Sequence, residues 1–341
     1  MISPVQESAE LSDLELRLIN VLQVDPRVSW SRAGEALGVD PSTVARTWKS
    51  LAASGRVWVS AYPRATPAGV PFVAFIEVGC RVGARTAVAD ALAERPWAAT
   101  IEHATGGRDL LVSVLASGLS ALSGVLSEEL EAIDGIRAVR VQLATVVAVE
   151  GGGWRLRAVE PDAVRRLAED RTEVRFHPMR LDEHDVLLVT ELGRDARAGY
   201  SELAALSGLG ISTVRRRVQR LIANGAVSLR CEVAQALSGW PVSAAIWCRV
   251  PPAELEAVMS GFAGMPEVRL CAALTGGTAN LFVSLWVRSP GELHRLEGQL
   301  SAQARGIEVV DRMLALRHIK RMGHLLDAAG RSVGVVPVVP A

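Results

Sequence analysis

The chain has 341 residues, of which 49% are hydrophobic and 22% are charged. This length predicts two or more hydrophobic cores, because single cores stop growing near ~250–300 residues. Lys plus Arg and Asp plus Glu both number 37, which excludes a global field that attracts a polyanion but not local basic patches. No apolar run approaches the ~20 residues of a membrane helix, and residues 1–10 lack the pattern of a secretory signal, so we expect a cytoplasmic protein.

The cysteines and histidines give no sign of a metal site. Cys80, Cys231, Cys248 and Cys271 lie far apart in apolar stretches, where a small buried side chain is the favoured interpretation. The six histidines form no HExxH motif and no pair one helical turn apart. We therefore expect neither a metal nor a cofactor.

An internal repeat organises the chain. With a shift of 170 residues, segment 11–57 aligns on 181–227 without a gap, and fifteen of these 47 positions are identical. The register continues to Thr105-Gly106-Gly107, which corresponds to Thr275-Gly276-Gly277, and one inserted residue then moves the offset to 171. So long a period indicates a duplicated two-domain unit rather than a solenoid of short repeats.

Each unit opens with helical signals. Ser12 and Glu15 form a capping box ahead of apolar residues that recur once per helical turn, and Asp182 repeats this start in the second copy. After a short second helix, a third begins at Asp40-Pro41 and runs to Gly55. A helix, a short helix, a Gly turn and a further helix within about fifty residues predict a helix-turn-helix.

The second part of each unit alternates strand and helix signals in the order β-α-β-β-α-β, which is typical of a ferredoxin-like domain. The predicted fold class is therefore α+β, with two winged-helix or helix-turn-helix domains that alternate with two ferredoxin-like domains. The predicted boundaries are 11–57 for the first helix-turn-helix, 69–150 for the first ferredoxin-like domain, 151–180 for a linker with an amphipathic stretch at 161–170, 181–227 for the second helix-turn-helix, 239–321 for the second ferredoxin-like domain, and 322–341 for a tail that is loose from 332 onward.

The third helix of each helix-turn-helix carries the candidate DNA contacts. Val44, Trp48 and Leu51 share one side, so Arg46 faces outward, and Arg216 occupies the same position in the second copy. An outward Arg can hold guanine O6 and N7, while Ser and Thr at a helix start contact phosphate or base edges. The candidate DNA-binding residues are Ser42, Thr43, Arg46, Lys49, Ser212, Thr213, Arg215, Arg216, Arg217 and Arg220.

The two third helices differ in charge. Segment 210–230 has five Arg and no acid, whereas 40–56 nets +2, so we expect the second copy to supply more of the phosphate affinity. Because their outward residues differ, we also expect an asymmetric operator. Charged outward faces also occur on solvated helical bundles, but two copies in register favour DNA binding.

The motifs Val39–Val44, Leu209–Val218 and Thr105–Leu110 together resemble those of the Lrp/AsnC family of transcriptional regulators, in a tandem form that covers residues 11–320. The resemblance implies double-stranded DNA as a partner. It also implies that the two halves dock as an intramolecular pseudo-dimer, able to assemble further, with both third helices on one side. Small ligands, commonly amino acids, bind between effector domains in this family.

By this resemblance the first effector turn is Thr105, Gly106, Gly107, Arg108 and Asp109. Its glycines let backbone N–H groups approach a carboxylate, and Asp109 can hold an ammonium or cap the turn. The second turn, with Gly276, Gly277 and Asn280 as the candidate ligand residues, is one residue longer and loses the charge of Asp109, which weakens the expectation of an amino acid there. Tight turns between strands use the same residue types without any ligand.

We predict a sequence-specific DNA-binding regulator, not an enzyme, that is modulated by an amino acid or a related metabolite. Two alternatives remain. Siroheme decarboxylases look similar but need basic or His residues in a large cleft, for which His103 is the one candidate, with Ala273 at the equivalent position. A ligand-independent architectural DNA-binding protein is the other.

Overall fold

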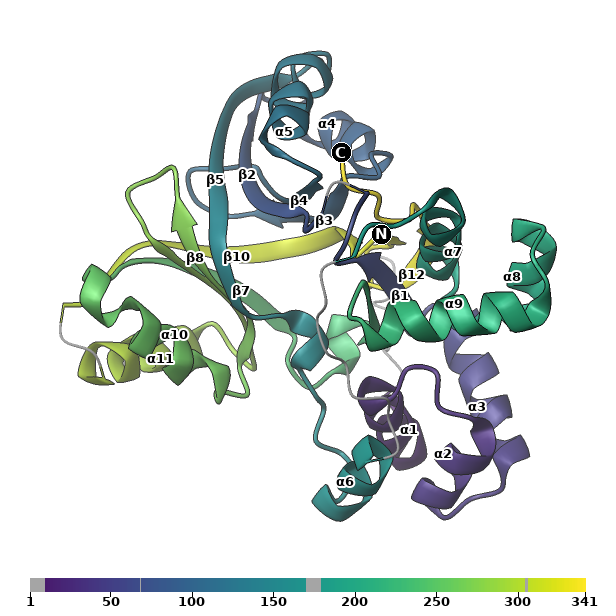
Figure 1. Ribbon diagram of the computed structural model, residues 1–341. Helices are drawn as coiled ribbons and strands as arrows, with labels where there is room; N and C mark the ends of the chain where they lie inside the picture. The colour runs from purple at the N-terminus through teal and green to yellow at the C-terminus, as the bar shows by residue number, and fades with distance from the viewer. Residues whose placement is uncertain (1–9, 68, 170–178, 304–305) are drawn as a thin grey trace, which may run out of the picture.

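The computed structural model describes residues 10–67, 69–169, 179–303 and 306–341, so residues 170–178 of the predicted linker lie outside it. Figure 1 shows the helix-turn-helix elements gathered at the lower right and the two ferredoxin-like domains at the top and at the left. The linker that follows the first ferredoxin-like domain in the chain contains a short turn (η2, Gly151–Gly153) and helix α6, Pro161–Glu169, which packs beside α1.

Each helix-turn-helix has the predicted three helices. Ser12 accepts a hydrogen bond from the Glu15 amide and Glu15 bonds back, Asp182 caps the equivalent helix, and Asp40 accepts from the Ser42 amide. A strand follows each third helix. The elements are α1 (Asp13–Val24), α2 (Trp30–Leu37), α3 (Pro41–Ala53) and β1 (Val57–Pro63), then α7 (Glu183–Arg194), α8 (Tyr200–Ser207), α9 (Ile211–Ala223) and β6 (Val227–Val233).

The two helix-turn-helix domains share one small sheet and one hydrophobic core. β1 pairs antiparallel with β6, so that Val57 lies opposite Val233 and Pro63 opposite Val227. Helix α7 packs on β1 and α1 packs on β6, and Leu22 and Leu192 belong to the same buried cluster. The two strands, which begin where the predicted domains end, therefore join both domains into one unit.

The ferredoxin-like domains follow the predicted β-α-β-β-α-β order, and the α+β fold class is confirmed. The first contains β2 (Phe72–Cys80), α4 (Arg85–Ala93), β3 (Ala98–Ala104), β4 (Leu110–Ala116), α5 (Leu119–Gly124) continued by a π-helical turn (η1, Val125–Leu130), and β5 (Ile136–Val149). The second contains β7 (Val242–Arg249), α10 (Leu255–Ala263), β8 (Val268–Thr275), β9 (Leu281–Val287), α11 (Gly291–Gln303) and β10 (Glu308–Arg321), with short helical turns η3 (Gln235–Leu237) and η4 (Pro252–Glu254) before β7 and α10.

Eight strands of these domains form one closed antiparallel sheet. Its order is β10-β3-β4-β2-β5-β8-β9-β7, and β7 pairs back with β10. The two longest strands make the connection, because β5 pairs first with β2 and then with β8, while β10 pairs first with β7 and then with β3. Figure 1 shows both as long ribbons that extend from one half to the other. The two halves thus form an intramolecular pseudo-dimer.

Buried hydrophobic side chains pack on both faces of this closed sheet. Helices α4 and α5 cover Ile76 and Leu110 on the outside of one half, and α10 covers Leu285 on the outside of the other. Inside, Phe282 lies 4.5 Å from Phe75 and 4.9 Å from Trp247 between ring centroids.

The prediction of a loose tail from 332 onward is wrong. After β10 the chain forms β11 (His324–Leu326) and β12 (Ser332–Val335), which pair with each other. The terminal Ala341 amide donates to Leu115 O and its carbonyl accepts from Ser117 N. Val338 is only 3% exposed, against Tyr62, Ala99 and Leu115. Burial of this valine and closure of its backbone hydrogen bonds order the segment.

None of the helices in the described ranges is both long enough and apolar enough to cross a membrane.

Candidate functional site

The third helices, α3 and α9, present the outward residues that the sequence predicted. Val44 and Leu51 of α3, like Val214 and Leu221 of α9, are buried, while Arg46 and Arg216 are exposed. In the part of the chain that the structure describes, neither of these arginines has an ion-pair partner. Figure 1 shows both helices on the same side of the molecule, away from the ferredoxin-like helices.

The remaining predicted DNA contacts fall into two groups. Those exposed beside Arg46 and Arg216 are Ser42, Lys49, Ser212 and Arg215, with Thr43 and Thr213 half-buried. Arg217 and Arg220 instead form ion pairs within the protein. Arg217 lies 2.7 Å from both Asp182 and Asp185, and Arg220 lies 2.7 Å from Asp185, at the start of α7.

A reciprocal contact between the two copies holds these domains together. Arg27 donates to the carbonyls of Ala196 and Ala198 at 2.5 and 2.9 Å, and its guanidinium lies 5.2 Å from the Tyr200 ring. Arg197, the equivalent residue, donates to Pro26 O and Val28 O at 2.6 and 2.9 Å. It stacks 3.8 Å over the Trp30 ring, the counterpart of Tyr200.

This contact was missed in the sequence, although the repeat carried a signal for it. Asp25 and Arg27 recur as Asp195 and Arg197. In each copy the Asp carboxylate accepts from the backbone amide of the Arg two residues on, at 3.0 and 2.7 Å, and so fixes the turn from which the Arg projects. Hydrogen bonds from charged donors are among the stronger ones in proteins, so four of them set the spacing of α3 and α9.

The first effector turn is built into the junction between the copies. The Thr105 amide and hydroxyl pair with the backbone of Leu314 on β10. Arg108 is buried, forms an ion pair with Asp311, and stacks 4.1 Å over the Trp247 ring. Asp109 accepts from the Cys80 amide at 2.8 Å. Gly106 and Gly107 are exposed.

The second turn repeats this structural role with different atoms. Asn280, at the position of Asp109, accepts from the Val250 amide at 2.9 Å and donates to the Val250 carbonyl at 2.8 Å. A Cβ at Gly276 would lie 3.0 Å from Val141 O, and one at Gly277 would collide with the Gln142 side chain. Gly276, whose φ is 95°, is therefore required by its turn and by the close approach of the β5 backbone, whereas Gly277 contacts only the end of a long side chain.

A cavity that the sequence analysis did not predict lies between the β1–β6 sheet and the interior of the closed sheet. Its volume is about 550 Å³, and strands of both copies line it. Phe75, Val146, Leu270 and Phe282 contribute an apolar wall, and charged side chains from β3, β6, β8 and β10 line the remainder. This size and this mixture of surfaces are typical of a small-molecule site.

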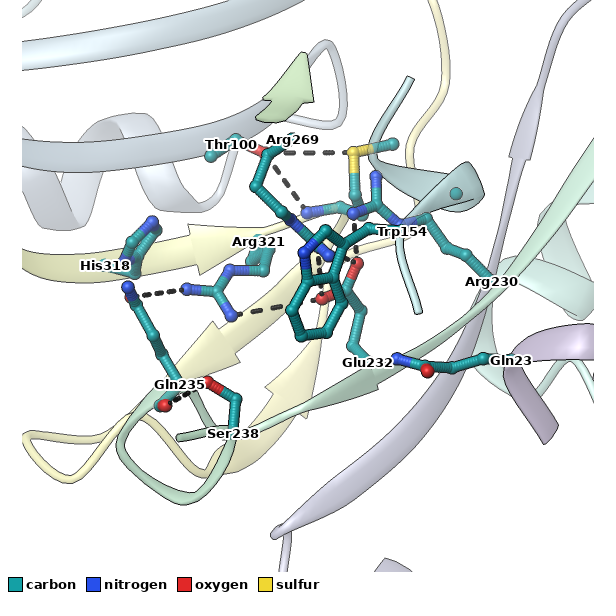
Figure 2. Close-up of polar contacts among 12 residues, drawn as sticks. Gln23, Thr100, Trp154, Arg230, Glu232, Gln235, Ser238, Arg269, His318 and Arg321 are labelled. Atoms are coloured by element: carbon teal, nitrogen blue, oxygen red, sulfur yellow. Dashed lines mark hydrogen bonds and ion pairs between the residues drawn. The ribbon is translucent and has the colours of Figure 1, made fainter. Parts of the chain in front are cut away.

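Three arginines converge on one carboxylate at this cavity (Figure 2). Glu232 on β6 forms an ion pair with Arg230, lies 3.3 Å from Arg269 and lies 3.9 Å from Arg321. Arg269 is sandwiched between the rings of Trp286 and Trp154, at 4.0 and 4.7 Å. Burial lowers the pKa of Arg269, partly opposed by Glu232, and the other two guanidiniums lower it further.

A second buried pair lines the same cavity. His318 Nε2 lies 2.9 Å from the carboxylate of Glu102, which also accepts from Ser243. Burial, followed by the charge of Arg321, lowers the pKa of His318, and Glu102 opposes this shift. Burial alone raises the pKa of Glu102, but His318 and Arg321 bring it below its usual value. His103, the sequence candidate, instead contacts Arg85 and does not line the cavity.

The fold joins two helix-turn-helix domains, a module typical of DNA-binding proteins, to a pair of ferredoxin-like domains. The AsnC-type helix-turn-helix domain matches residues 11–52 and 181–222, and the Lrp/AsnC ligand binding domain matches 73–152. An uncharacterized HTH-type transcriptional regulator of Pyrococcus abyssi is 30% identical over 147 residues, which cover 43% of this chain and 92% of that protein. The chain therefore belongs to the Lrp/AsnC family of transcriptional regulators.

Two further similarities cover very different shares of this chain. The HTH-type transcriptional regulator LrpA of Mycobacterium tuberculosis is 51% identical over 47 residues, 14% of this chain and 31% of its own length. The crystal structure of the siroheme decarboxylase NirDL superposes with a TM-score of 0.58 at 14% identity, covering 91% of this chain and 93% of NirDL. At that identity the match shows a shared fold alone. The fold is shared over nearly the whole length of both chains.

Proposed function

We propose that the protein is a sequence-specific, cytoplasmic DNA-binding regulator rather than an enzyme, and that a small metabolite modulates it. The observation that carries this proposal is a pair of outward arginines, Arg46 and Arg216, that have no ion-pair partner among the described residues. They lie on helices α3 and α9, whose spacing the Arg27 and Arg197 contacts fix. Rigidly spaced helices that expose one Arg each suit two half-sites on one duplex.

In this proposal Arg46 and Arg216 read guanines, and Ser42, Thr43, Ser212 and Thr213 contact phosphates or base edges. Lys49 and Arg215 add phosphate contacts. Arg217 and Arg220 contribute to the local positive field while paired with Asp182 and Asp185, and reach DNA only if they leave these partners. Because Lys49 corresponds to Gln219, the two half-sites differ and the operator is asymmetric.

The effector proposal rests on the matched ligand-binding domain, residues 73–152. Gly106 and Gly107 of the first turn are exposed, which suits an approach of a carboxylate to the backbone, with Thr105, Arg108 and Asp109 holding the turn in shape. Gly276, Gly277 and Asn280 are the weaker candidates, because packing against β5 accounts for the two glycines and the hydrogen bonds to Val250 account for Asn280. The proposed domain division keeps the predicted boundaries up to residue 321. We also propose that the pseudo-dimer assembles further with other copies of the chain.

The test is binding of the full chain to DNA from upstream of its own gene, followed by fluorescence anisotropy, with shuffled DNA of equal composition as the control. We expect a preference of at least tenfold for the upstream fragment and a steep fall in affinity with salt. Equal affinity for both fragments at low salt contradicts the proposal. Repetition with each amino acid tests modulation, and unchanged affinity throughout favours the ligand-independent architectural protein.

A second candidate function is a siroheme-decarboxylase-like activity. Two observations favour it: the whole-chain fold similarity to NirDL, and a cavity that contains His318 and three arginines. Incubation with siroheme and mass analysis of the product tests it. A mass loss that corresponds to carbon dioxide, absent in a His318→Ala variant, supports the enzyme; unchanged siroheme contradicts it.

A further inference from the structure

The charges around the cavity described above do not balance. Arg230, Arg269 and Arg321 share a single buried carboxylate, Glu232. Two acids line the cavity itself: Glu102 pairs with His318 and is also a counter-charge of Arg321, and Glu150 accepts from Tyr62 at 3.0 Å and lies 3.2 Å from Arg64. With Arg64 included, four guanidiniums therefore face three carboxylates, Glu102, Glu150 and Glu232. A buried cation without a full counter-charge is costly, so this cluster favours one more anion.

Two buried donors of this arginine cluster have no hydrogen-bond partner among the described residues. Arg321 is only 5% exposed, lines the cavity, and has a buried Nη1 that lacks a hydrogen-bond partner among the described residues. Nε of Arg230 is also buried and also lacks a hydrogen-bond partner among the described residues. Guanidinium groups bind carboxylates through paired N–H donors. Both nitrogens are themselves inaccessible and Nη1 of Arg321 lies 3.9 Å from Glu232, so an anion in the cavity meets the lining guanidiniums and gains these donors only when the side chains turn toward it.

The remaining lining specifies the rest of the ligand. Phe75, Phe282, Leu270 and Val146 offer an apolar wall, and the Trp286 ring lies beside the arginines. A multiply charged group is disfavoured because Glu102 and Glu150 also line the cavity. A single negative charge on an apolar body fits both surfaces.

We propose that this cavity binds a monocarboxylate with an apolar or aromatic body, whose carboxylate contacts Arg321 and Arg230 beside Glu232. The site is separate from the two effector turns, whose Thr105, Arg108 and Asn280 do not line it.

The position of the site also gives it a route to the DNA-binding helices. Arg230 and Glu232 belong to β6, which directly follows α9, whereas Arg269 and Arg321 belong to β8 and β10 of the closed sheet. An added carboxylate therefore acts on the ion pairs that join the helix-turn-helix unit to the effector sheet. This regulatory effect rests on the proposed DNA-binding function, but the binding of the carboxylate does not.

The binding test is calorimetry on the full chain without DNA, using phenylacetate, octanoate and 1-naphthylacetate. The neutral control is 1-naphthylacetamide, which has nearly the same shape without the charge. We expect at least one carboxylate to bind saturably with one site per chain, and the amide to bind at least tenfold more weakly than 1-naphthylacetate. Binding by none of the three carboxylates, or equal binding of amide and acid, overturns the proposal.

Three variants locate the site. Arg321→Gln removes the free donor, and Ser284→Phe fills the cavity without touching its charges; each should weaken binding at least tenfold. Arg288 stacks on Trp240 outside the cavity, so the Arg288→Gln variant should bind the carboxylate as the native chain does. Because Ser284→Phe leaves every arginine in place, loss in that variant is independent of any folding defect caused by Arg321→Gln. Unchanged binding in both cavity variants overturns the proposal.

The regulatory arm repeats the anisotropy titration with the carboxylate that binds. A severalfold change in DNA affinity, absent in Ser284→Phe, supports coupling. Unchanged DNA affinity leaves the binding site standing and overturns the coupling alone. No preference for upstream DNA in any condition contradicts the proposed function, and the calorimetric result remains valid.

Discussion

Arg27 and Arg197 occupy equivalent positions in the two copies, and each donates two hydrogen bonds to backbone carbonyls in the turn that carries the other. Each guanidinium also stacks on the aromatic residue that begins the other copy's second helix. Burial, and then the charge of Arg27, lower the pKa of Arg197 to about 10, so Arg197 stays protonated at neutral pH. The pseudo-twofold arrangement of helices α3 and α9 thus depends on a contact that places two arginine side chains close together.

Replacement of Arg197 by Met should loosen that relation. The change removes two charged hydrogen bonds and leaves the carbonyls of Pro26 and Val28 without these donors, which costs about 2–3 kcal/mol of unfolding free energy. We expect weaker binding to a DNA fragment that contains both half-sites and a much smaller effect on a single half-site. Urea unfolding and anisotropy measure these two quantities. Arg194→Met, which removes an exposed pair with Glu191, is the control; equal losses in both variants would contradict this role.

Adjacent residues on α9 should respond oppositely to replacement by alanine. Arg216 is exposed without an ion-pair partner among the described residues, so Arg216→Ala should weaken DNA binding about tenfold while leaving stability unchanged. Arg217 holds Asp182 and Asp185, and Asp185 is almost fully buried, so Arg217→Ala should lower the unfolding free energy by about 1–2 kcal/mol. Thermal unfolding and anisotropy on both variants check the pair. A larger stability loss in Arg216→Ala would mean that α9 faces inward.

The sequence predicted the fold well because its evidence is local and periodic. Capping residues, apolar spacing and Gly turns decide helices and strands within a few residues, and the internal repeat shows each decision twice. Asp109 and Asn280 illustrate the limit. They differ in charge but both cap the end of a strand through the same backbone amide position, which only the structure reveals.

The cavity escaped prediction for a different reason. Arg230, Arg269 and Arg321 come from three strands, β6, β8 and β10, that are separated in the sequence. Their convergence depends on the pairing of β5 with β8 and of β10 with β3, which closes the sheet. Strand order between domains has no local signature, so residues that meet across it cannot be grouped in advance.

Buried Lys320 predicts a specific dependence of stability on pH. Its side chain is inaccessible, its Nζ donates to Arg95 O at 2.7 Å, and burial lowers its pKa to about 8. An unfolded Lys titrates near ~10.4, so between about pH 8 and 10 the unfolded chain binds more protons than the folded one. Unfolding free energy therefore rises with pH in this window, and the full penalty is present below pH 8.

Lys320→Met should remove this penalty. At pH 7 the variant should be more stable by up to about 3 kcal/mol, less about 1 kcal/mol for the lost hydrogen bond, and the advantage should shrink toward pH 10. Urea unfolding of both proteins at pH 7, 8, 9 and 10 measures the difference, in which other titrating groups cancel. A difference that does not vary with pH would show that Lys320 titrates normally in the folded chain.

The ordered C-terminal segment predicts a sharp contrast between two neighbouring valines. Val338 is 3% exposed and packs against Tyr62 of β1 and Leu115 of β4, so it joins the helix-turn-helix unit to the first ferredoxin-like domain. Val339 is 36% exposed. Val338→Ala deletes two buried methyl groups and should cost about 2 kcal/mol of unfolding free energy, whereas Val339→Ala should cost less than about 0.5 kcal/mol. Urea unfolding distinguishes them, and equal, negligible losses would restore the loose tail that the sequence had predicted.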